Sequence, residues 1–537
     1  MYSKFGRGAP LLSGNATVPG QHLTEIEKDL FSKILVACRE AGADFYPTII
    51  QKLTYDEMSE IVAYNGFPNR YPHWRFGMAY EEFHKGYEYG MQRVFEIVIN
   101  TSPCVMYLLN SNTLLDNATV VAHATFHNDF FKNNIVFKPT NTGMMNKMAN
   151  HGNRIRKYID RYGAETVFEF IDNILAIETL IDPVKIWDER QIQEPIIQDK
   201  KEYELPRRVM VPVGHDYMEP YFNTKEFKEK EDERIKHIDK IKDLGIFAEP
   251  EKDIFGFIKN YAPLKPWQAD IASMLYDEAL YFSPQGMTKT INEGFASYGD
   301  FDMMCRRGWA DMIGTNYGCG IIEYAKHKMM VLGDKYGANP YRLGFQLLMD
   351  IEDRWDKGKF GDEWENCRDL NKKENWDEKL GKGREKVFEV RKYYDDVMLI
   401  NEFFTQDFCQ KYEFFEWKRQ PNGDHVIENR GDTPESFKKI KNNLVRSKLN
   451  RGLPDIRLTD PNHRNKGWML LQHVWDGRML EERYTRETMT ALYSLWGSEI
   501  VLASRNYGGD EVVFLCVGKD ADKDTVVMKR LEYDDYK

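Results

Sequence analysis

Through residues 1–440, apolar side chains mostly recur every three or four positions, which is the period of an amphipathic α-helix. The repeat first appears over residues 24–65, and the first helix of this stretch is predicted to end near Gly42. Further helices are predicted over residues 118–131, 144–159 and 165–181. The pattern favours a protein made mainly of packed helices.

Residues 441–537 follow a different pattern. The segments DIRLTD, GWMLLQHVWDG, EIVLASR and EVVFLCVG alternate or run in β-branched and apolar residues, as strands do. A helix over residues 485–496, closed by Gly497, interrupts them. The sequence therefore predicts a mainly α fold, with a large helical N-terminal domain and a small α+β C-terminal domain.

Two charge-rich stretches with few aliphatic residues interrupt the helical part, and we interpret them as an exposed insertion and a linker. The predicted segments are a helical domain (1–222), a charged helical insertion (223–253), a helical region that completes the core (254–360), a charged linker (361–383), a helical connector (384–440) and the α+β domain (441–537).

The predicted helix at residues 118–131 carries the most informative spacing. His123 and His127 are four residues apart, on one face and one turn apart, so both imidazoles can bind the same ion. In the H-E-x-x-H motif of zinc proteases the glutamate is the general base, but Ala124 occupies that position here. With 12 histidines in 537 residues, the expected number of such pairs by chance is about a quarter of one. The pair alone is therefore weak evidence for a metal site, and further ligands must support it.

Two residues are candidates for a further ligand. Glu293 lies in a later predicted helix, and a separate helix often supplies the glutamate that completes a histidine-pair zinc site. The alternative for Glu293 is a surface glutamate beside a glycine. His151 shares an apolar helical face with Met148 and Ile155 and is expected to point inward, either as a ligand or as a hydrogen-bonded core histidine.

Because Ala124 cannot accept a proton, a metal-dependent hydrolase with this helix needs another carboxylate as its base. Asp129 is a candidate because it is close in sequence. Glu278 is a second candidate, since it shares a helical face with Ile271 and Leu275 and is predicted to be buried, where a carboxylate needs a cation or a proton.

Composition narrows the classes of function. The formal net charge of -11 argues against a general nucleic-acid binder, and 30% charged with 13% aromatic residues describe a folded protein. We predict a cytoplasmic protein without a membrane span, because there is neither a signal sequence nor a run of about 18 apolar residues. The 7 cysteines are scattered without C-x-x-C spacing, so neither a disulfide framework nor a cysteine zinc site is predicted.

Most of the chain resembles the stage V sporulation protein R (SpoVR) family. The matching stretches, in the family's order, are RYPHWRFG, YEYGMQRVFEIVIN, VAHATFHNDFFKNN, ANHGNRIRKYIDR, APLKPWQADI, EALYFSPQGMTKTINEGFASY and NPYRLGFQLLMDIEDRWDKGKFG. The resemblance implies a link to the spore cortex, a peptidoglycan layer. Where many relatives read EGWASYWH, this chain has Gly299 and Asp300 in place of the Trp-His pair. We therefore expect Asp300 to replace that histidine as a ligand or base, or the activity to be lost.

Three hypotheses remain open at this stage. The first is a hydrolase with a gluzincin-like arrangement of helices, in which His123, His127 and Glu293 bind zinc and act on an amide or ester related to peptidoglycan. Iron suits the same ligands. The second is a structural or regulatory protein, with a closed metal site that includes His151 and charged segments that recruit protein partners. In the third, the histidines bind no metal and only form hydrogen bonds in a polar core.

Overall fold

The computed structural model describes residues 23–88, 96–187, 250–313, 319–333, 339–506, 508–519 and 526–532, with isolated positions between 225 and 236. The chain divides into two compact units. Unit 1 consists of Met1–Arg156 and Pro284–Arg451, and unit 2 consists of Lys157–Ser283 and Gly452–Lys537. The charged insertion predicted at residues 223–253 lies mostly outside the described residues.

The first half of unit 1 contains a small sheet and the helix with the two histidines. Its elements are α1 (Glu25–Glu40), β1 (Thr48–Leu53), α2 (Tyr55–Ala63), α3 (Trp74–Glu88), β2 (Glu96–Ile99), β3 (Cys104–Leu109), α4 (Leu114–Asn133) and the first part of α5 (Met144–Tyr162). The sheet order is β1-β3-β2, with β1 parallel and β2 antiparallel to the central β3. The helical prediction for residues 24–65 is wrong at β1, because a strand of 6 residues is too short for its period to be recognised.

The second half of unit 1 returns to the same core. Its elements are α11 (Lys289–Phe301), a π-helical turn (Asp302–Arg306), α12 (Trp309–Ile313), α13 (Gly320–Leu332), α14 (Pro340–Lys357), α15 (Gly361–Glu365), α16 (Leu370–Glu374), α17 (Gly383–Tyr393), α18 (Asp396–Phe403), α19 (Gln406–Lys411), the hairpin β4 (Glu416–Arg419) and β5 (His425–Asn429), and α20 (Pro434–Lys448). Short helices thus lie within the charged stretch at 361–383, and a hairpin precedes α20.

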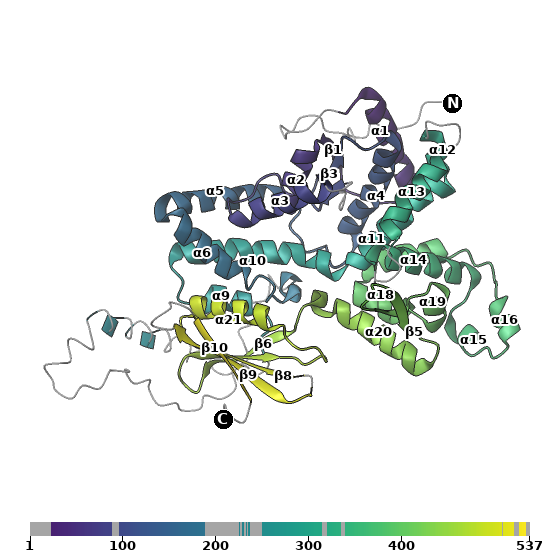
Figure 1. Ribbon diagram of the computed structural model, residues 1–537. Helices are drawn as coiled ribbons and strands as arrows, with labels where there is room; N and C mark the ends of the chain where they lie inside the picture. Colours follow the sequence, from purple (N-terminus) through teal and green to yellow (C-terminus); the bar gives the residue numbers. More distant parts are fainter. Residues whose placement is uncertain are drawn as a thin grey trace. The chain divides into compact units, whose positions relative to one another are not determined.

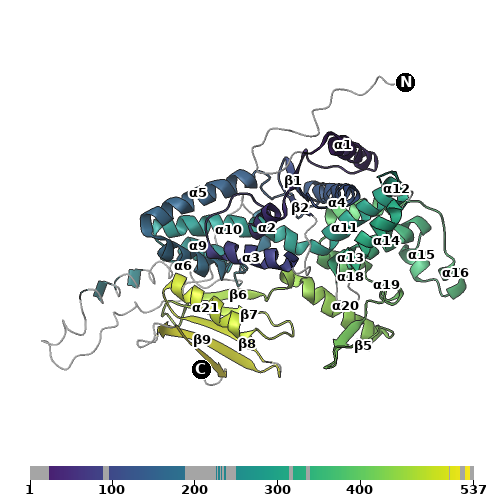
Figure 2. The same cartoon turned by 45° about the horizontal axis from the view of Figure 1, so that its top comes forward.

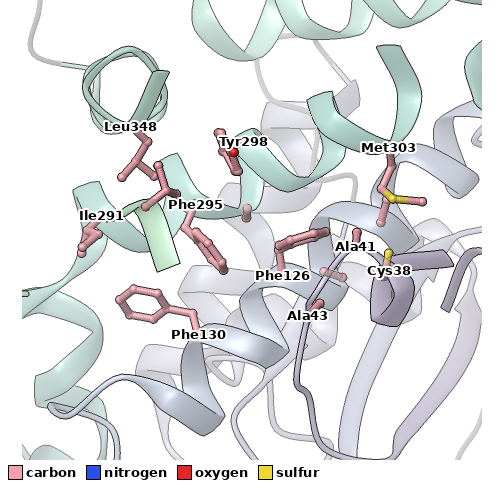
Figure 3. Packing of buried hydrophobic residues seen from close by; sticks show 14 of the residues in the cluster. Cys38, Ala41, Ala43, Phe126, Phe130, Ile291, Phe295, Tyr298, Met303 and Leu348 are labelled. Atoms are coloured by element: carbon pink, nitrogen blue, oxygen red, sulfur yellow. The ribbon is translucent and has the colours of Figure 1, made fainter. Parts of the chain in front are cut away.

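Helix α4 forms the centre of unit 1 and is buried on all sides along most of its length. Figure 1 shows α11 beside α4, and α14 beside α11. Figure 3 shows Phe126 and Phe130 of α4 close to Phe295 of α11, and the Phe126 and Phe295 rings meet edge to face at 5.5 Å. A Cβ on Gly294 would lie 2.4 Å from the Gly344 backbone, so glycine there allows α11 and α14 to pack closely.

Unit 2 combines helices with a five-stranded sheet. Its elements are the rest of α5, α6 (Ala164–Leu175), a 3₁₀ helix (Pro183–Trp187), α9 (Ile254–Tyr261), most of α10 (Pro266–Met287), β6 (Ile456–His463), β7 (Trp468–His473), α21 (Glu482–Trp496), β8 (Ile500–Arg505), β9 (Glu511–Lys519) and β10 (Val526–Glu532). The order is β10-β9-β8-β7-β6, and α21 connects the parallel pair β7 and β8. Figure 2 shows α21 lying along this sheet.

The prediction of a mainly α protein with a small α+β region at its C-terminal end is confirmed. Strands β6 to β9 coincide with the four segments read as strands, and Gly497 ends α21 with a φ of 76°. None of the helices in the described part of the chain has the length and apolar character that crossing a membrane requires.

Candidate metal centre

The two histidines of α4 face each other across one helical turn. Their Nε2 atoms are 3.1 Å apart, and the ring planes are nearly perpendicular. The helix is held at its start by a capping box between Thr113 and Asp116 and continues without a break for 20 residues. Both imidazoles therefore project from one rigid, buried element.

The other nitrogen of each ring is occupied by a hydrogen bond to α11. Nδ1 of His123 lies 2.7 Å from Oδ2 of Asp300, and Nδ1 of His127 lies 2.9 Å from Oδ1 of Asn292. Carboxylate and amide oxygens are acceptors, so each Nδ1 carries the proton and donates. In a neutral ring the lone pair is then on Nε2, and two such lone pairs 3.1 Å apart require a cation between them.

Two glutamates extend this pair. Oε2 of Glu293, on α11, lies 3.3 Å from Nε2 of His127 and 3.9 Å from Nε2 of His123, and Oε1 of Glu96, on β2, lies 3.5 Å from Nε2 of His123. Two ligand atoms at 2.0–2.2 Å from one ion are roughly 2.8–3.6 Å apart in tetrahedral or octahedral geometry. The separation of Glu293 from His123 is wider, so the side chain of Glu293 would have to move slightly for it and both histidines to bind one ion.

Electrostatics at the centre also favour a cation. Oε2 of Glu96 and Oε2 of Glu293 are buried, and no hydrogen-bond partner exists for them among the described residues. Burial raises the pKa of Glu96. Burial acts on Glu293 in the same direction, but the two neighbouring histidines hold its pKa well below the usual range.

His123 responds to the same negative surroundings. Burial alone lowers its pKa, but the charge of Glu96, the hydrogen bond to Asp300 and the nearby carboxylate of Glu293 raise that pKa to about 10. The raised pKa shows how strongly this point attracts positive charge, which either a proton or a metal ion can supply.

Asp300 lies behind His123 rather than among the groups around the two Nε2 atoms. Its Oδ1 accepts a hydrogen bond of 2.6 Å from the hydroxyl of Tyr324, and its Oδ2 accepts one of 2.7 Å from Nζ of Lys328. Although burial opposes this, the charge of Lys328 and the bond to His123 keep the pKa of Asp300 below its usual range. Asp300 is therefore an ionised acceptor that fixes the ring of His123, a role distinct from the ligand or base expected from the sequence.

The remaining predicted site residues lie elsewhere. Oδ1 of Asp129, which is fully buried, pairs with Nη1 of Arg391 at 2.9 Å, and Oδ2 accepts a hydrogen bond from the backbone N–H of Asp44. Glu278 is buried on α10, within unit 2. His151 is buried on α5. Across the described residues, His151 belongs to no group of three metal-ligating side chains with ligand atoms within 4.8 Å of one another, whereas Glu96, His123 and His127 form such a group.

Sequence reasoning missed Glu96 and Tyr341. Glu96 is the only charged residue in the apolar run VFEIVI, and that isolated charge was the available signal. It is paired opposite Leu108 of β3, so its approach to the histidines depends on a sheet that the sequence did not reveal. Tyr341, at the start of α14, stacks on His123 with ring centroids 6.4 Å apart. Burial and the charges of Glu293 and Glu96 raise the pKa of Tyr341, so its hydroxyl stays protonated.

A mainly helical unit with two histidines and two carboxylates at one point is typical of a metalloprotein. Comparison with known proteins gives the family. The family described as "SpoVR like protein" matches residues 21–453, and "SpoVR-like C-terminal domain" matches residues 454–507. The chain belongs to the SpoVR family, as its resemblance predicted. All the residues of the centre lie within the first match.

A bacterial protein is similar to this chain over most of its length. A protein of Escherichia coli strain K12 with the name "Uncharacterized protein YcgB" is 26% identical over 495 residues, which cover 87% of this chain and 89% of the relative. No solved structure is significantly similar to the chain.

Proposed function

We propose that this SpoVR-family protein is a metal-dependent hydrolase in which His123, His127 and Glu293 hold a zinc ion, with iron as the other metal that suits these ligands. The observation that carries the proposal is the Nε2 to Nε2 separation of 3.1 Å between two rings whose Nδ1 atoms are already hydrogen-bonded. The buried carboxylate oxygens beside them add the negative charge that a divalent ion would neutralise.

A divalent ion bound there would polarise the carbonyl of an amide or ester and lower the pKa of a water molecule. The chain must supply a proton acceptor, because Ala124 replaces the usual glutamate. Glu96 suits this role, since burial raises its pKa while that of the neighbouring Glu293 is lowered. When two carboxyl groups have pKa values driven apart, the one with the raised pKa commonly transfers protons and the other stays ionised. Glu96 would take a proton from the attacking water and return it to the leaving group.

Tyr341 completes the proposed set of groups. Its protonated hydroxyl lies near the carboxylate of Glu293, where it can donate a hydrogen bond to the oxygen that becomes negative during attack on a carbonyl. Asp129 is not used as the base in this mechanism, because it is paired with Arg391. Glu278 is not used either, since Glu96 supplies a proton acceptor beside His123.

Solvent access favours catalysis over a purely structural metal. The side chains of His123 and His127 remain 10% and 9% exposed, and those of Glu96 and Glu293 remain 18% and 17% exposed. A closed structural site is expected to exclude water from its ligands. The second candidate, a structural or regulatory protein, would follow if Glu96 served as a permanent fourth ligand.

The proposed substrate is an amide or ester derived from peptidoglycan, handled in the cytoplasm. It follows from the association of the SpoVR family with the spore cortex and from the carbonyl chemistry of the centre. The described helices offer no membrane span that would argue for another location.

Elemental analysis of the purified full chain tests the metal, and the expected result is about one zinc or iron per chain. His123→Ala and His127→Ala should lose it with their circular dichroism unchanged, whereas His425→Ala, at an exposed histidine on β5, should retain it. Protein that stays free of metal in metal-replete buffer would refute the metal centre. If metal binds but muropeptides are never cleaved, and Glu96→Gln also lowers metal content, the structural alternative holds.

A further inference from the structure

Unit 2 contains a cavity of about 540 Å³ that the metal centre does not involve. It lies between the end of α6, the loop that follows β7, strands β6 to β8, and α21. Most of its lining is aliphatic or methionine, and the side chains include Leu175, Leu180, Ile456, Leu471, Met489 and Leu502. The volume falls within the roughly 300–1,000 Å³ that small-molecule sites usually have.

A space of this size is unusual between a helix and a sheet. Protein interiors are close-packed, and apolar space left empty lowers stability in proportion to its volume. Elsewhere in unit 2 the packing is tight, as shown by Trp496, which is fully buried and donates a hydrogen bond to the backbone oxygen of Gly467. Among the lining residues, Tyr484 is 68% exposed, so the cavity is open to solvent at that side chain.

Two buried polar side chains line the cavity, Thr485 of α21 and His473 of β7, and the Thr485 hydroxyl already donates to the backbone oxygen of Glu481. Nδ1 of His473 is 3.0 Å from Oγ of Ser504, and no partner for Nε2 is found in the described part of the chain. Burial lowers the pKa of His473, so the ring is neutral at pH 7. A neutral imidazole with one available nitrogen can form a single hydrogen bond with an uncharged group.

Charges at the cavity disfavour an anion. Arg478 is paired with Asp476 through Nε and Oδ2 at 2.8 Å, so these two residues neutralise each other. Glu481 caps α21 by accepting a hydrogen bond from the N–H of Tyr484, and no lysine or arginine of the described residues forms an ion pair with it. The lining therefore has one uncompensated negative charge, together with a neutral histidine and a mostly apolar wall.

We propose that this cavity binds an uncharged, mainly hydrocarbon small molecule with one hydrogen-bonding group. The hydrocarbon part would lie against β6 to β8 and α21, and the polar group would meet Nε2 of His473. The proposal is independent of the metal centre because its residues all belong to unit 2.

Three eight-carbon probes separate this ligand class from its charged analogues. The full chain is titrated with 1-octanol, octanoate and octylammonium, and binding is measured by calorimetry and by the shift in melting temperature. We expect 1-octanol to bind at least tenfold more tightly than either ion, because an ion would lose its hydration in a mostly apolar cavity. Equal or tighter binding of octanoate or octylammonium, or no binding of 1-octanol, overturns the proposal.

Variants locate the binding in the cavity. Ala176→Phe places a ring in the lined space and should abolish binding of 1-octanol, whereas Ser494→Phe, on the exposed side of α21, should not. His473→Phe keeps the ring but removes its nitrogens and should weaken 1-octanol about 3- to 10-fold, the effect of one hydrogen bond. Wild-type affinity in folded Ala176→Phe, or in His473→Phe if the first variant does not fold, contradicts the assignment. Metal content should stay unchanged in all three variants.

Discussion

Helix α4 presents buried charge on two sides, and the two sides are neutralised differently. On one side, Asp129 pairs with Arg391 of α17, so the chain provides both the carboxylate and its cation. On the other side, Glu96 and Glu293 meet two histidines, and no arginine or lysine of the described residues forms an ion pair with either glutamate. Lys328 lies behind His123, where it pairs with Asp300.

The difference separates a structural ion pair from a binding site. A buried carboxylate needs a compensating charge, and where the chain supplies one the group is part of the scaffold. Where the chain supplies only imidazoles with their lone pairs directed at one point, the missing charge must come from a proton or a bound ion. The same helix thus faces two kinds of buried charge. Asp129 and Arg391 neutralise each other, and we call them the closed pair. The side with His123, His127, Glu96 and Glu293 still needs a positive charge, and we call it the open pair or open side.

Breaking the closed pair should have the largest effect. Arg391→Met leaves Asp129 buried without its cation, and we expect a loss of about 3–5 kcal/mol in the free energy of unfolding. Urea denaturation of metal-free protein measures it. Adding Asp129→Leu removes the second charge and should recover a large part of the loss. A single variant that loses less than about 1 kcal/mol would show that the two sides of α4 do not differ in this way.

A smaller effect is expected from a change at Asp300, which supports His123 of the open pair. Asp300→Asn keeps a hydrogen-bond acceptor near Nδ1 of His123 but removes the charge that makes the ring a better ligand. Metal affinity should fall about 10- to 100-fold, as changes in groups that support metal ligands commonly cause. Competition with a chelator measures this affinity. Asp302→Asn is the matched control, because Asp302 pairs with Arg307 instead of His123. Equal affinities in both variants would contradict the positioning role of Asp300.

The contact between α4 and α11 should also affect the open side. A Cβ on Gly299 would lie 2.1 Å from the ring of Phe126, so Gly299→Ala forces the helices apart. We expect a loss of about 1–3 kcal/mol in the free energy of unfolding, the usual cost of overpacking, and weaker metal binding because Asp300 moves with α11.

Two variants test whether this contact is the cause. Phe126→Leu combined with Gly299→Ala should restore part of the stability, because a smaller side chain makes room for the new methyl group. Gly77→Ala, on α3, adds a methyl group with no atom within 4 Å and should not destabilise the protein. If the double variant is no more stable than Gly299→Ala, the Phe126 contact is not what limits this position.

How much of the fold and of the metal centre could be predicted depended on how far apart in the sequence the interacting residues lie. The histidine pair could be predicted because its members lie within one helical turn, and Glu293 because it completes a known arrangement. Asp129 is close to His127 in sequence but not on the same face, because two residues further along a helix is about 200° around it. Glu96 and the pairing of Asp300 with Lys328 depend on β2 and α13, whose positions only the folded chain fixes.

The smallest expected effect on stability concerns Glu27 of α1. Like Asp129 and Asp300, it has a basic partner in the chain, because its Oε1 lies 2.8 Å from Nζ of Lys52. Burial alone raises the pKa of Glu27, but hydrogen bonds from Lys52 and Thr24 lower it below its usual range. Its ionised form therefore stabilises the fold above the unfolded pKa of about 4.3, and this contribution disappears as the pH falls through the lower pKa of the folded state.

Glu27→Gln keeps the shape of the capping box with Thr24 but removes the charge, so it isolates the ion pair. The variant should lose about 0.5–1 kcal/mol at pH 7 and nothing once the pH lies below the folded pKa of Glu27. Thermal unfolding between pH 3 and pH 7 measures the difference. Glu25→Gln, at a glutamate whose side chain is 89% exposed, should match the wild type throughout. A loss in Glu27→Gln that does not change with pH would mean that packing, rather than the supplied cation, accounts for the contribution of Glu27.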